Sequence, residues 1–199
     1  MKNKAIFGYG GFASEVYAYM KPQFPDVVHF VNEQYYQKGI KNLFSLKDFI
    51  PEDFEIIIAV ANPSDKKKIA MNLPESTQYF SFIHESCIIS DNNIEIGEGT
   101  IICPNCVLTT DIVLGKHAHL NVGSVIGHNA RIGNYFTSAP SVNISGNCTI
   151  GDEVYFGTNS CIKQKLNVCS KVTIGMGACV SKNIEQSGTY VGIPAIKIK

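Results

Sequence analysis

Two different rhythms of hydrophobic and polar positions divide the chain. Between Ile96 and Val180, a span of 85 residues, every sixth residue is large and apolar at fourteen of fifteen positions, and the exception is Ser138. A period of six fits neither an α-helix, which repeats every 3.6 residues, nor a plain strand, which repeats every two. It predicts a triangular coil of three short strands, 18 residues per coil, with the large side chains pointing inward.

The residues around this apolar ladder support the same coil. The residue two places before each ladder position is apolar or small, and glycine often follows the ladder position, as at Gly97, Gly115 and Gly127. Glycine and small polar residues let a chain turn at a corner. We therefore expect a parallel β-helix over this part of the chain.

The first 83 residues follow another pattern. Expected strands cover residues 4–7, 27–31, 54–61 and 79–83, and expected helices cover residues 12–20 and 64–73. The apolar run of the third strand is continuous, as in a strand that is buried on both faces. Alternating strands and helices predict a small parallel α/β domain.

Composition and charge narrow the class of protein. Apolar residues make up 45% of the chain, charged residues 17%, and glycine 17 of 199 residues, which favours a turn-rich β protein over disorder. Lys plus Arg and Asp plus Glu are both 17, so we expect no nucleic-acid partner. The longest apolar run, 56–61, is far short of the ~20 residues that span a bilayer. Membrane insertion is therefore not expected.

The seven cysteines are scattered, and the first residues lack a signal-peptide core. This indicates free thiols and a cytoplasmic protein. Cys103-Pro104-Asn105-Cys106 has the C-x-x-C form. Without a second ligand pair or a thioredoxin-like setting, we interpret this segment as structural.

Gly8-Tyr9-Gly10-Gly11 joins the first expected strand to the first expected helix, and with Ala13 it has the lettering of a dinucleotide-binding turn. Backbone N–H groups at such a helix start can receive a phosphate. The domain is only half the size of a full dinucleotide fold. Three interpretations stay open: a site for a single nucleotide diphosphate, a purely structural turn, and an NAD site.

The whole chain resembles the bacterial sugar-nucleotide acetyltransferases of the left-handed β-helix (hexapeptide-repeat) superfamily. Within it, the chain is most similar to the bacillosamine- and perosamine-type aminosugar N-acetyltransferases and to the sialic acid O-acetyltransferases. The resemblance rests on the glycine turn, on Val191-Gly192-Ile193-Pro194-Ala195 near the other end, and on segments between them. These segments are Lys66-Lys67-Lys68-Ile69, Phe82-Ile83-His84-Glu85-Ser86, Leu120-Asn121, Val125-Ile126-Gly127-His128 and Ser145-Gly146-Asn147.

The resemblance implies two domains. Residues 1–83 would form a small α/β, Rossmann-like domain that binds a nucleotide sugar, and residues 84–199 a left-handed β-helix with a C-terminal cap. It further implies a homotrimer with acetyl-CoA as co-substrate in the groove between two subunits, and no metal. The acceptor would be the amino group of a nucleotide-linked deoxy-aminosugar destined for a surface glycan such as lipopolysaccharide or capsule.

The same resemblance assigns the site residues. His128 matches the catalytic histidine, and Asn129 follows it. Asn121 could hold the acceptor or the thioester, and the N–H of Gly146 is a candidate oxyanion donor. Residues expected to bind the nucleotide sugar are Gly8, Gly10, Gly11, Asn32, Glu33 and Asn62. Residues expected to bind acetyl-CoA are Thr137, Gly146, Thr158, Gly175, Met176, Ile193 and Pro194. Asn129 stands where the family commonly has Glu or Asp, and Thr137 where it commonly has His.

Other chemistries remain as alternatives. A base beside a hydroxyl would look the same in sequence, so O-acetylation of a sialic acid or a similar sugar stays open, as does a non-catalytic nucleotide-binding scaffold. His117, His119 and His128 suggest a zinc site of the γ-carbonic-anhydrase type, but their separations of two and nine residues do not fit one. We expect His84 to be a turn or packing residue, and His29 to be structural or to lie at the nucleotide's edge.

Overall fold

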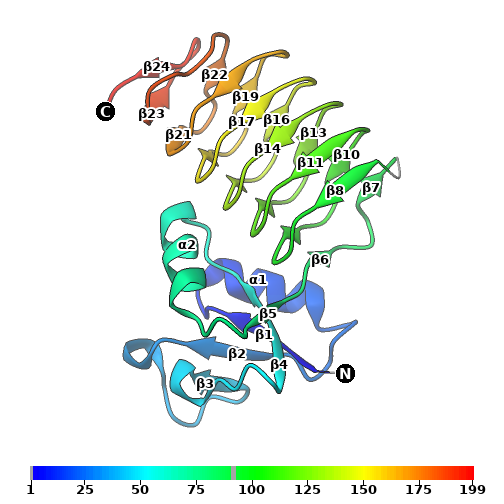
Figure 1. Ribbon diagram of the computed structural model, residues 1–199, viewed down its shortest axis with the longest axis vertical. Coiled ribbons are helices and arrows are strands. Elements are labelled where there is room, and N and C mark those ends of the chain that lie inside the picture. Colours follow the sequence, from blue (N-terminus) through cyan, green and yellow to red (C-terminus); the bar gives the residue numbers. More distant parts are fainter. Residues whose placement is uncertain (1, 91–92) are drawn as a thin grey trace.

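The computed structural model describes residues 2–90 and 93–199, and the molecule has two unlike parts (Figure 1). A small parallel sheet with two helices forms one end, and a stack of triangular coils extends from it to the C-terminus. The coils form a left-handed parallel β-helix, which confirms this part of the predicted fold.

The N-terminal sheet has five parallel strands in the order β3-β2-β1-β4-β5. Its elements along the chain are β1 (Asn3–Phe7), α1 (Gly11–Met20), β2 (Val28–Val31), the 3₁₀ turn η1 (Glu33–Tyr35), β3 (Leu43–Ser45), the 3₁₀ turn η2 (Leu46–Asp48), β4 (Phe54–Ile58), α2 (Pro63–Asn72) and β5 (Gln78–Tyr79). The run Ile56, Ile57 and Ile58 is fully buried, because β4 is covered on both faces.

The two helices begin and pack for identifiable reasons. The buried residues of α1 are Ala13, Val16 and Met20, which share one side of the helix and pack in the core that includes Ile57. At the start of α2, Oδ1 of Asn62 accepts hydrogen bonds from the two backbone N–H groups of residues 64 and 65, at 3.0 and 3.1 Å. This is an N-cap, and it fixes where the helix begins.

Three expectations for this part need correction. The strand expected over 54–61 ends at Ile58. The strand expected over 79–83 divides: Tyr79 belongs to β5 of the N-terminal sheet, whereas β6 (Phe82–Ile83) pairs with a strand of the solenoid. The short strand β3 was not predicted. The chain therefore passes from one sheet to the other between Tyr79 and Phe82.

Three sheets form the sides of the solenoid, and we call them faces I, II and III. Face I contains β6, β9 (Ile101–Ile102), β12 (His119–Leu120), β15 (Thr137–Ser138), β18 (Tyr155–Phe156), β21 (Val172–Ile174), β23 (Gly188–Val191) and β24 (Ile196–Lys197). Face II contains β7 (Ile88–Ile89), β10 (Val107–Leu108), β13 (Val125–Ile126), β16 (Asn143–Ile144), β19 (Cys161–Ile162) and β22 (Cys179–Val180). Face III contains β8 (Ile94–Ile96), β11 (Ile112–Leu114), β14 (Arg131–Ile132), β17 (Thr149–Ile150) and β20 (Asn167–Val168).

The strand register reproduces the sequence period. Val125 pairs with Asn143 and Ile126 with Ile144, so partners in neighbouring coils are 18 residues apart, as predicted. Ser138, the polar exception in the ladder, also points inward and is fully buried. Its hydroxyl oxygen lies 2.9 Å from that of Ser124, so the two hydroxyls satisfy each other inside the core.

We name each edge of the prism by the two faces that it joins. Several edge turns place an asparagine in the left-handed region, such as Asn129 (φ 60°) and Asn147 (φ 57°) on edge II–III and Asn159 (φ 56°) on edge I–II. Asparagine adopts this conformation more easily than most residues, because its short side chain can hydrogen-bond locally.

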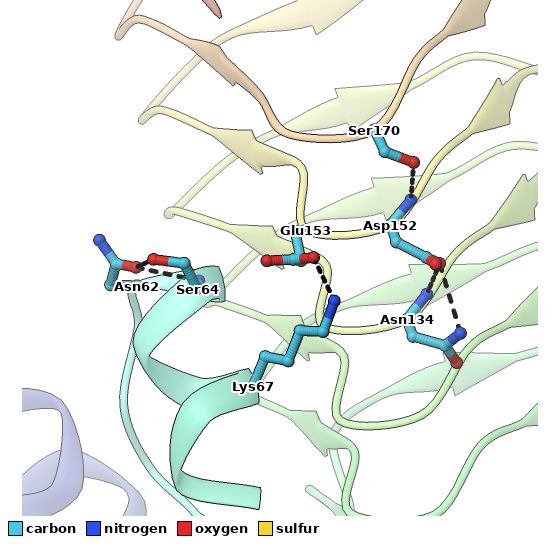
Figure 2. Close-up of polar contacts among 7 residues, drawn as sticks. All are labelled: Asn62, Ser64, Lys67, Asn134, Asp152, Glu153 and Ser170. Atoms are coloured by element: carbon cyan, nitrogen blue, oxygen red, sulfur yellow. Dashed lines mark hydrogen bonds and ion pairs between the residues drawn. The ribbon is translucent and has the colours of Figure 1, made fainter. Parts of the chain in front are cut away.

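Helix α2 connects the two parts of the molecule (Figure 2). Nζ of Lys67 lies 2.6 Å from Oε1 of Glu153 on edge III–I. Side chains also tie successive coils of this edge together: Oδ1 of Asp152 accepts the N–H of Asn134 at 2.7 Å, and the N–H of Asp152 donates to Oγ of Ser170 at 3.0 Å. The helix therefore rests on a reinforced edge.

Candidate functional site

His128 stands on edge II–III, in the turn between β13 and β14, with its side chain exposed. Its Nδ1 lies 2.8 Å from Oδ1 of Asn129. An amide oxygen can only accept a hydrogen bond, so Nδ1 carries the proton and donates it. The neutral ring therefore presents an unprotonated Nε2, which is the form that a general base requires.

Gly146 lies directly against the His128 ring, one coil further along the solenoid. A Cβ at this position would be 2.5 Å from Nε2 and 2.6 Å from Cε1 of His128, so the ring can occupy its place only because residue 146 is glycine. Nδ2 of Asn147 also approaches Nδ1, at 3.4 Å. The structure thus brings together three of the predicted site residues, namely His128, Asn129 and Gly146.

Asn121 lies on a different edge of the same chain. It follows β12 on edge I–II, and its Oδ1 accepts the N–H of Val122 at 2.7 Å. His128 stands on the other edge of face II. Within one chain, the structure therefore does not bring the Asn121 and His128 side chains together.

Most residues predicted to bind acetyl-CoA gather on edge I–II. Thr158 and Met176 occupy equivalent turns of successive coils, and the turn that contains Ile193 follows them on the same edge. The side chains of Met176 and Ile193 are 82% and 80% exposed. Gly175 and Pro194 are the chain neighbours of these residues, so this set shares one exposed strip, separate from the His128 edge.

Thr137, which was predicted to bind acetyl-CoA, lies at the junction of the two parts of the molecule. It belongs to β15 beneath α2 and is only 3% exposed. Its Oγ1 accepts a hydrogen bond from Nζ of Lys66 at 3.0 Å, and the same amino group donates to the carbonyl of Phe136 at 3.0 Å. Lys66 is fully buried. A role of Thr137 in acetyl-CoA binding stays a prediction, and within one chain its hydroxyl is already used at this junction.

Two buried histidines share this junction with Lys66. The ring of His119 packs against Phe12, with 5.1 Å between ring centroids, and the ring of His117 stacks on Tyr135 at 5.2 Å. Burial, followed by the nearby Lys66, lowers the pKa of both histidines, that of His117 to about 4. Both rings are therefore neutral packing residues, facing away from the His128 edge. No group of three or more His, Cys, Asp or Glu among the described residues is arranged to hold a metal ion.

A cavity of about 930 Å³ opens where β1, β2 and β4 end. Ligands of parallel α/β sheets bind at this edge, beyond the carboxyl ends of the strands. Four of the predicted nucleotide-binding residues line it: Gly8, Gly10, Gly11 and Asn32. Sequence reasoning missed its other lining residues that carry polar groups, which are Tyr9, Gln34, Tyr35, Gln37, Asp65, Lys68 and Asn72. The rule that ligands bind beyond the carboxyl ends of parallel strands could have identified these residues from the sequence.

The start of α1 is open toward this cavity. Gly10 gives the helix no side-chain cap, the first turn has no acidic residue, and a Cβ at Gly10 or Gly11 would meet no atom within 4 Å. A helix start of this kind offers its unpaired N–H groups to an anion. Gly8 has a different role. Its φ of 121° favours glycine, and a Cβ there would lie 3.1 Å from the carbonyl oxygen of Ala59.

His29 supports the glycine turn. Its Nδ1 lies 2.8 Å from the carbonyl oxygen of Gly8, and because a carbonyl only accepts, Nδ1 donates. The ring packs against Tyr9 and Tyr17, with centroid distances of 5.3 and 5.0 Å. Burial lowers the pKa of His29, so the ring stays neutral. These contacts make His29 a positioning residue for the turn.

Two residues predicted to bind the nucleotide do not line the cavity. The carboxylate of Glu33 accepts a hydrogen bond from Oγ of Ser45 at 3.0 Å and pairs with Lys47 at 2.9 Å. The side chain of Asn62 caps α2. Both side chains hold local structure, and their contact with a nucleotide stays a prediction.

The remaining histidine and the cysteines have structural surroundings. Nδ1 of His84 accepts the N–H of Ser86 at 3.2 Å, which closes the predicted turn. All seven cysteines are free. Cys103 and Cys106 are buried, and burial raises the pKa of the Cys103 thiol to about 12, so this segment has no reactive thiolate. Neither α1 nor any other helix within the described ranges is long and apolar enough to cross a bilayer.

The chain is similar in sequence to a bacterial aminosugar acetyltransferase. It is 28% identical over 124 residues to the GDP-perosamine N-acetyltransferase of Escherichia coli O157:H7, an alignment that covers 62% of this chain and 55% of that protein. The chain thus spans about half the length of this curated relative. No family model matches the chain.

Solved structures match over the full length. WeeI from Acinetobacter baumannii AYE has a TM-score of 0.91 at 28% identity and covers 100% of both chains. The acetyltransferase domain of PglB from Neisseria gonorrhoeae FA1090, in complex with acetyl coenzyme A, has a TM-score of 0.90 at 24% identity over 99% of both chains. PerB from Caulobacter crescentus, in complex with CoA and GDP-perosamine, has a TM-score of 0.87 at 18% identity, covering 100% of this chain and 98% of that one. The last two show a shared fold, and together the comparisons confirm the resemblance drawn from the motifs.

Proposed function

We propose that this chain is an acetyl-CoA-dependent N-acetyltransferase that modifies the amino group of a nucleotide-linked aminosugar for a surface glycan. The observation that carries the proposal is the exposed His128, whose Nδ1 lies 2.8 Å from Oδ1 of Asn129, which leaves its Nε2 available to accept a proton. The relative named for GDP-perosamine N-acetylation and the neighbours solved with acetyl-CoA or CoA support the choice of acceptor and donor. The seven free cysteines support a reducing cytoplasm as the compartment.

The chemistry requires one proton acceptor that later becomes a donor. The amine nitrogen attacks the thioester carbonyl carbon, a C–N bond forms, and the C–S bond breaks. Nε2 of His128 takes the amine proton and passes it to the leaving thiolate of CoA, so the ring returns to its neutral form. The backbone N–H of Gly146 is the candidate donor to the oxyanion formed in between.

We infer that residues 1–83, apart from Phe82 and Ile83, which already pair with the solenoid, form a Rossmann-like domain for the sugar nucleotide, and that residues 84–199 form the β-helix domain with its C-terminal cap. The strand order β3-β2-β1-β4-β5 corresponds to the first five strands of a dinucleotide-binding sheet. The cavity at the strand ends suits one nucleotide. The open start of α1 at Gly10 and Gly11 then receives the diphosphate.

We also propose a homotrimer that packs through face II. The outward residues of face II carry no charge along its described strands: Ile88, Val107, Val125, Asn143, Cys161 and Cys179. Face III, in contrast, presents Glu95 and Arg131. An uncharged face is the less costly one to bury against a second copy, and a closed ring buries it without leaving an open contact.

Packing of face II around a three-fold axis would also complete the active site. Edge II–III of one copy would then adjoin edge I–II of the next. The groove between them would combine His128 of one subunit with Thr158, Met176 and Ile193 of its neighbour. This arrangement explains why the predicted site residues occupy two edges of a single chain.

An acetyl-transfer assay that detects the free thiol of CoA tests the activity. We expect turnover with an aminosugar linked to a nucleoside diphosphate and none with free sialic acid. Turnover with sialic acid alone would replace the proposal by O-acetylation. Absence of acetyl-CoA binding, measured by calorimetry, would replace it by a non-catalytic nucleotide-binding scaffold.

Mixed trimers test the shared groove. His128→Ala and Met176→Glu are each expected to lose activity, one through the base and the other through the neighbouring strip. Co-expressed, the two variants form some grooves with both wild-type edges, and part of the activity should return. A monomer in sedimentation, or no recovery in mixtures, would contradict the shared site.

A further inference from the structure

Three consecutive lysines on α2 have three different surroundings. Lys66 is buried in the junction with the solenoid, and Lys67 pairs with Glu153 there. Lys68 lines the cavity instead, with its side chain 72% exposed. Successive helix residues point about 100° apart. One turn of α2 therefore directs two lysines to the solenoid and one to the cavity.

Lys68 carries the one positive charge among the residues that the structure shows lining the cavity. Its nearest acidic neighbour is Asp65, one turn earlier on α2, with Nζ–Oδ1 at 3.6 Å and side chains 72% and 55% exposed. An exposed pair of this kind contributes little to stability. The lysine can therefore exchange this partner for a stronger anion at small cost.

The open start of α1 at Gly10 and Gly11 lines the same cavity as Lys68. A helix start supplies the equivalent of roughly half a positive charge. A diphosphate that links a nucleoside to a sugar carries more negative charge than that. A mobile cation elsewhere in the lining would supply what the helix start lacks, and a lysine is suited to contact phosphate as a point charge.

We propose that Lys68 binds the diphosphate of the sugar nucleotide, with its ammonium group facing the glycine turn across the cavity. The inference rests on the proposed function, because it assigns a further contact to the same nucleotide site. In this arrangement Asp65 acts against binding. Its carboxylate holds the lysine in the empty cavity and repels the phosphates that replace it.

The test is a double-mutant cycle on nucleotide affinity. Calorimetry first ranks UDP, dTDP and GDP on the wild-type protein, and the tightest of them is then titrated into Lys68→Met, Asp65→Asn and the double variant. We expect Lys68→Met to weaken binding by about tenfold in both backgrounds, the size of one charge-assisted contact. Asp65→Asn should tighten binding a few-fold. The dependence of Kd on salt should be smaller without the lysine.

Matched controls separate a contact from a general charge effect. Lys21→Met removes the same charge at the far end of α1, where the ammonium lies over Tyr17, and should leave Kd unchanged. Lys68→Arg should retain most of the affinity. The corresponding nucleoside, which lacks phosphates, should bind wild type and Lys68→Met equally.

Each contrary result has a definite meaning. If wild type binds none of the three nucleotides, the nucleotide site itself is wrong, and the inference fails with it. If wild type binds but Lys68→Met binds equally well, the inference alone is overturned. The same holds if Lys68→Met has no effect in the Asp65→Asn background, because the lysine would then serve only to neutralise Asp65.

Discussion

Nδ1 of His128 donates a hydrogen bond to Oδ1 of Asn129 at 2.8 Å. An amide at this place orients the ring and fixes its tautomer, but it adds no negative charge. A carboxylate in the same position would also stabilise the protonated ring. In the proposed mechanism His128 is the base, so its partner influences the pH at which activity is lost in acid.

Replacing Asn129 by Asp should move the acid limb of the pH–rate profile upward by as much as about one unit, because the added charge favours the imidazolium. Aspartate accepts the left-handed backbone found at this position. The measurement is kcat/KM as a function of pH. Asn159→Asp is the matched control, since it makes the same change in a left-handed turn on edge I–II. If the acid limb of the pH–rate profile of Asn129→Asp stays at the wild-type pH, residue 129 does not influence the pKa of the His128 ring.

Replacing His128 by Ala should lower turnover by roughly 10²–10⁴, the usual contribution of a general base. Acetyl-CoA and nucleotide affinity should stay near wild type, because the ring accepts a proton and holds neither ligand. His84→Ala, which removes a half-buried histidine in another turn, is the control and should retain activity. Near-normal turnover in His128→Ala would mean that positioning alone carries the reaction.

Substitution of Gly11 by Val should raise KM for the sugar nucleotide and leave KM for acetyl-CoA unchanged. The added side chain meets no protein atom within 4 Å, so its obstruction falls on the ligand. Gly8→Val makes a useful contrast, because φ is 121° and the added carbon approaches Ala59. That variant should instead lower the thermal midpoint. Equal loss of both affinities in Gly11→Val would indicate a purely structural turn.

Unfolding should become easier below pH 6.5 through the junction histidines. The pKa of His117 is about 4 when folded, against 6.5 when exposed, so between these values the unfolded chain binds a proton that the folded chain does not. The contribution of the neutral His117 ring to the free energy of unfolding is complete above pH 6.5 and is lost as the pH drops toward 4. His117→Asn, which tolerates the φ of 54°, should flatten the dependence of the free energy of unfolding on pH, measured in urea. His128→Ala should leave that slope unchanged.

The repeating part of the fold could be predicted from the sequence because each large apolar residue of the ladder points inward within its own coil, so the pattern depends on nearby residues alone. The glycine turn could also be recognised, because its lettering lies between Gly8 and Ala13, whereas the contacts that support it come from His29 and Ala59. Thr137 could not be placed in this way, because the lysine that occupies its hydroxyl is 71 residues distant in the chain. Glu33 likewise pairs with Lys47, which belongs to another element. Asn62 was predictable in principle, since Asn followed by Pro is a common way to start a helix.

The attachment of α2 to the solenoid through Lys66 and Lys67 bears on how this protein can diverge. The segment after β2, including Gln34 and Tyr35, lines the cavity proposed for the nucleotide, and β2 and β3 lie on the side of the sheet that faces away from the coils (Figure 1). Substitutions in that segment can alter which nucleoside is accepted without disturbing the junction or the His128 edge. Acceptor choice and acetyl transfer can thus evolve as separate traits within one short chain.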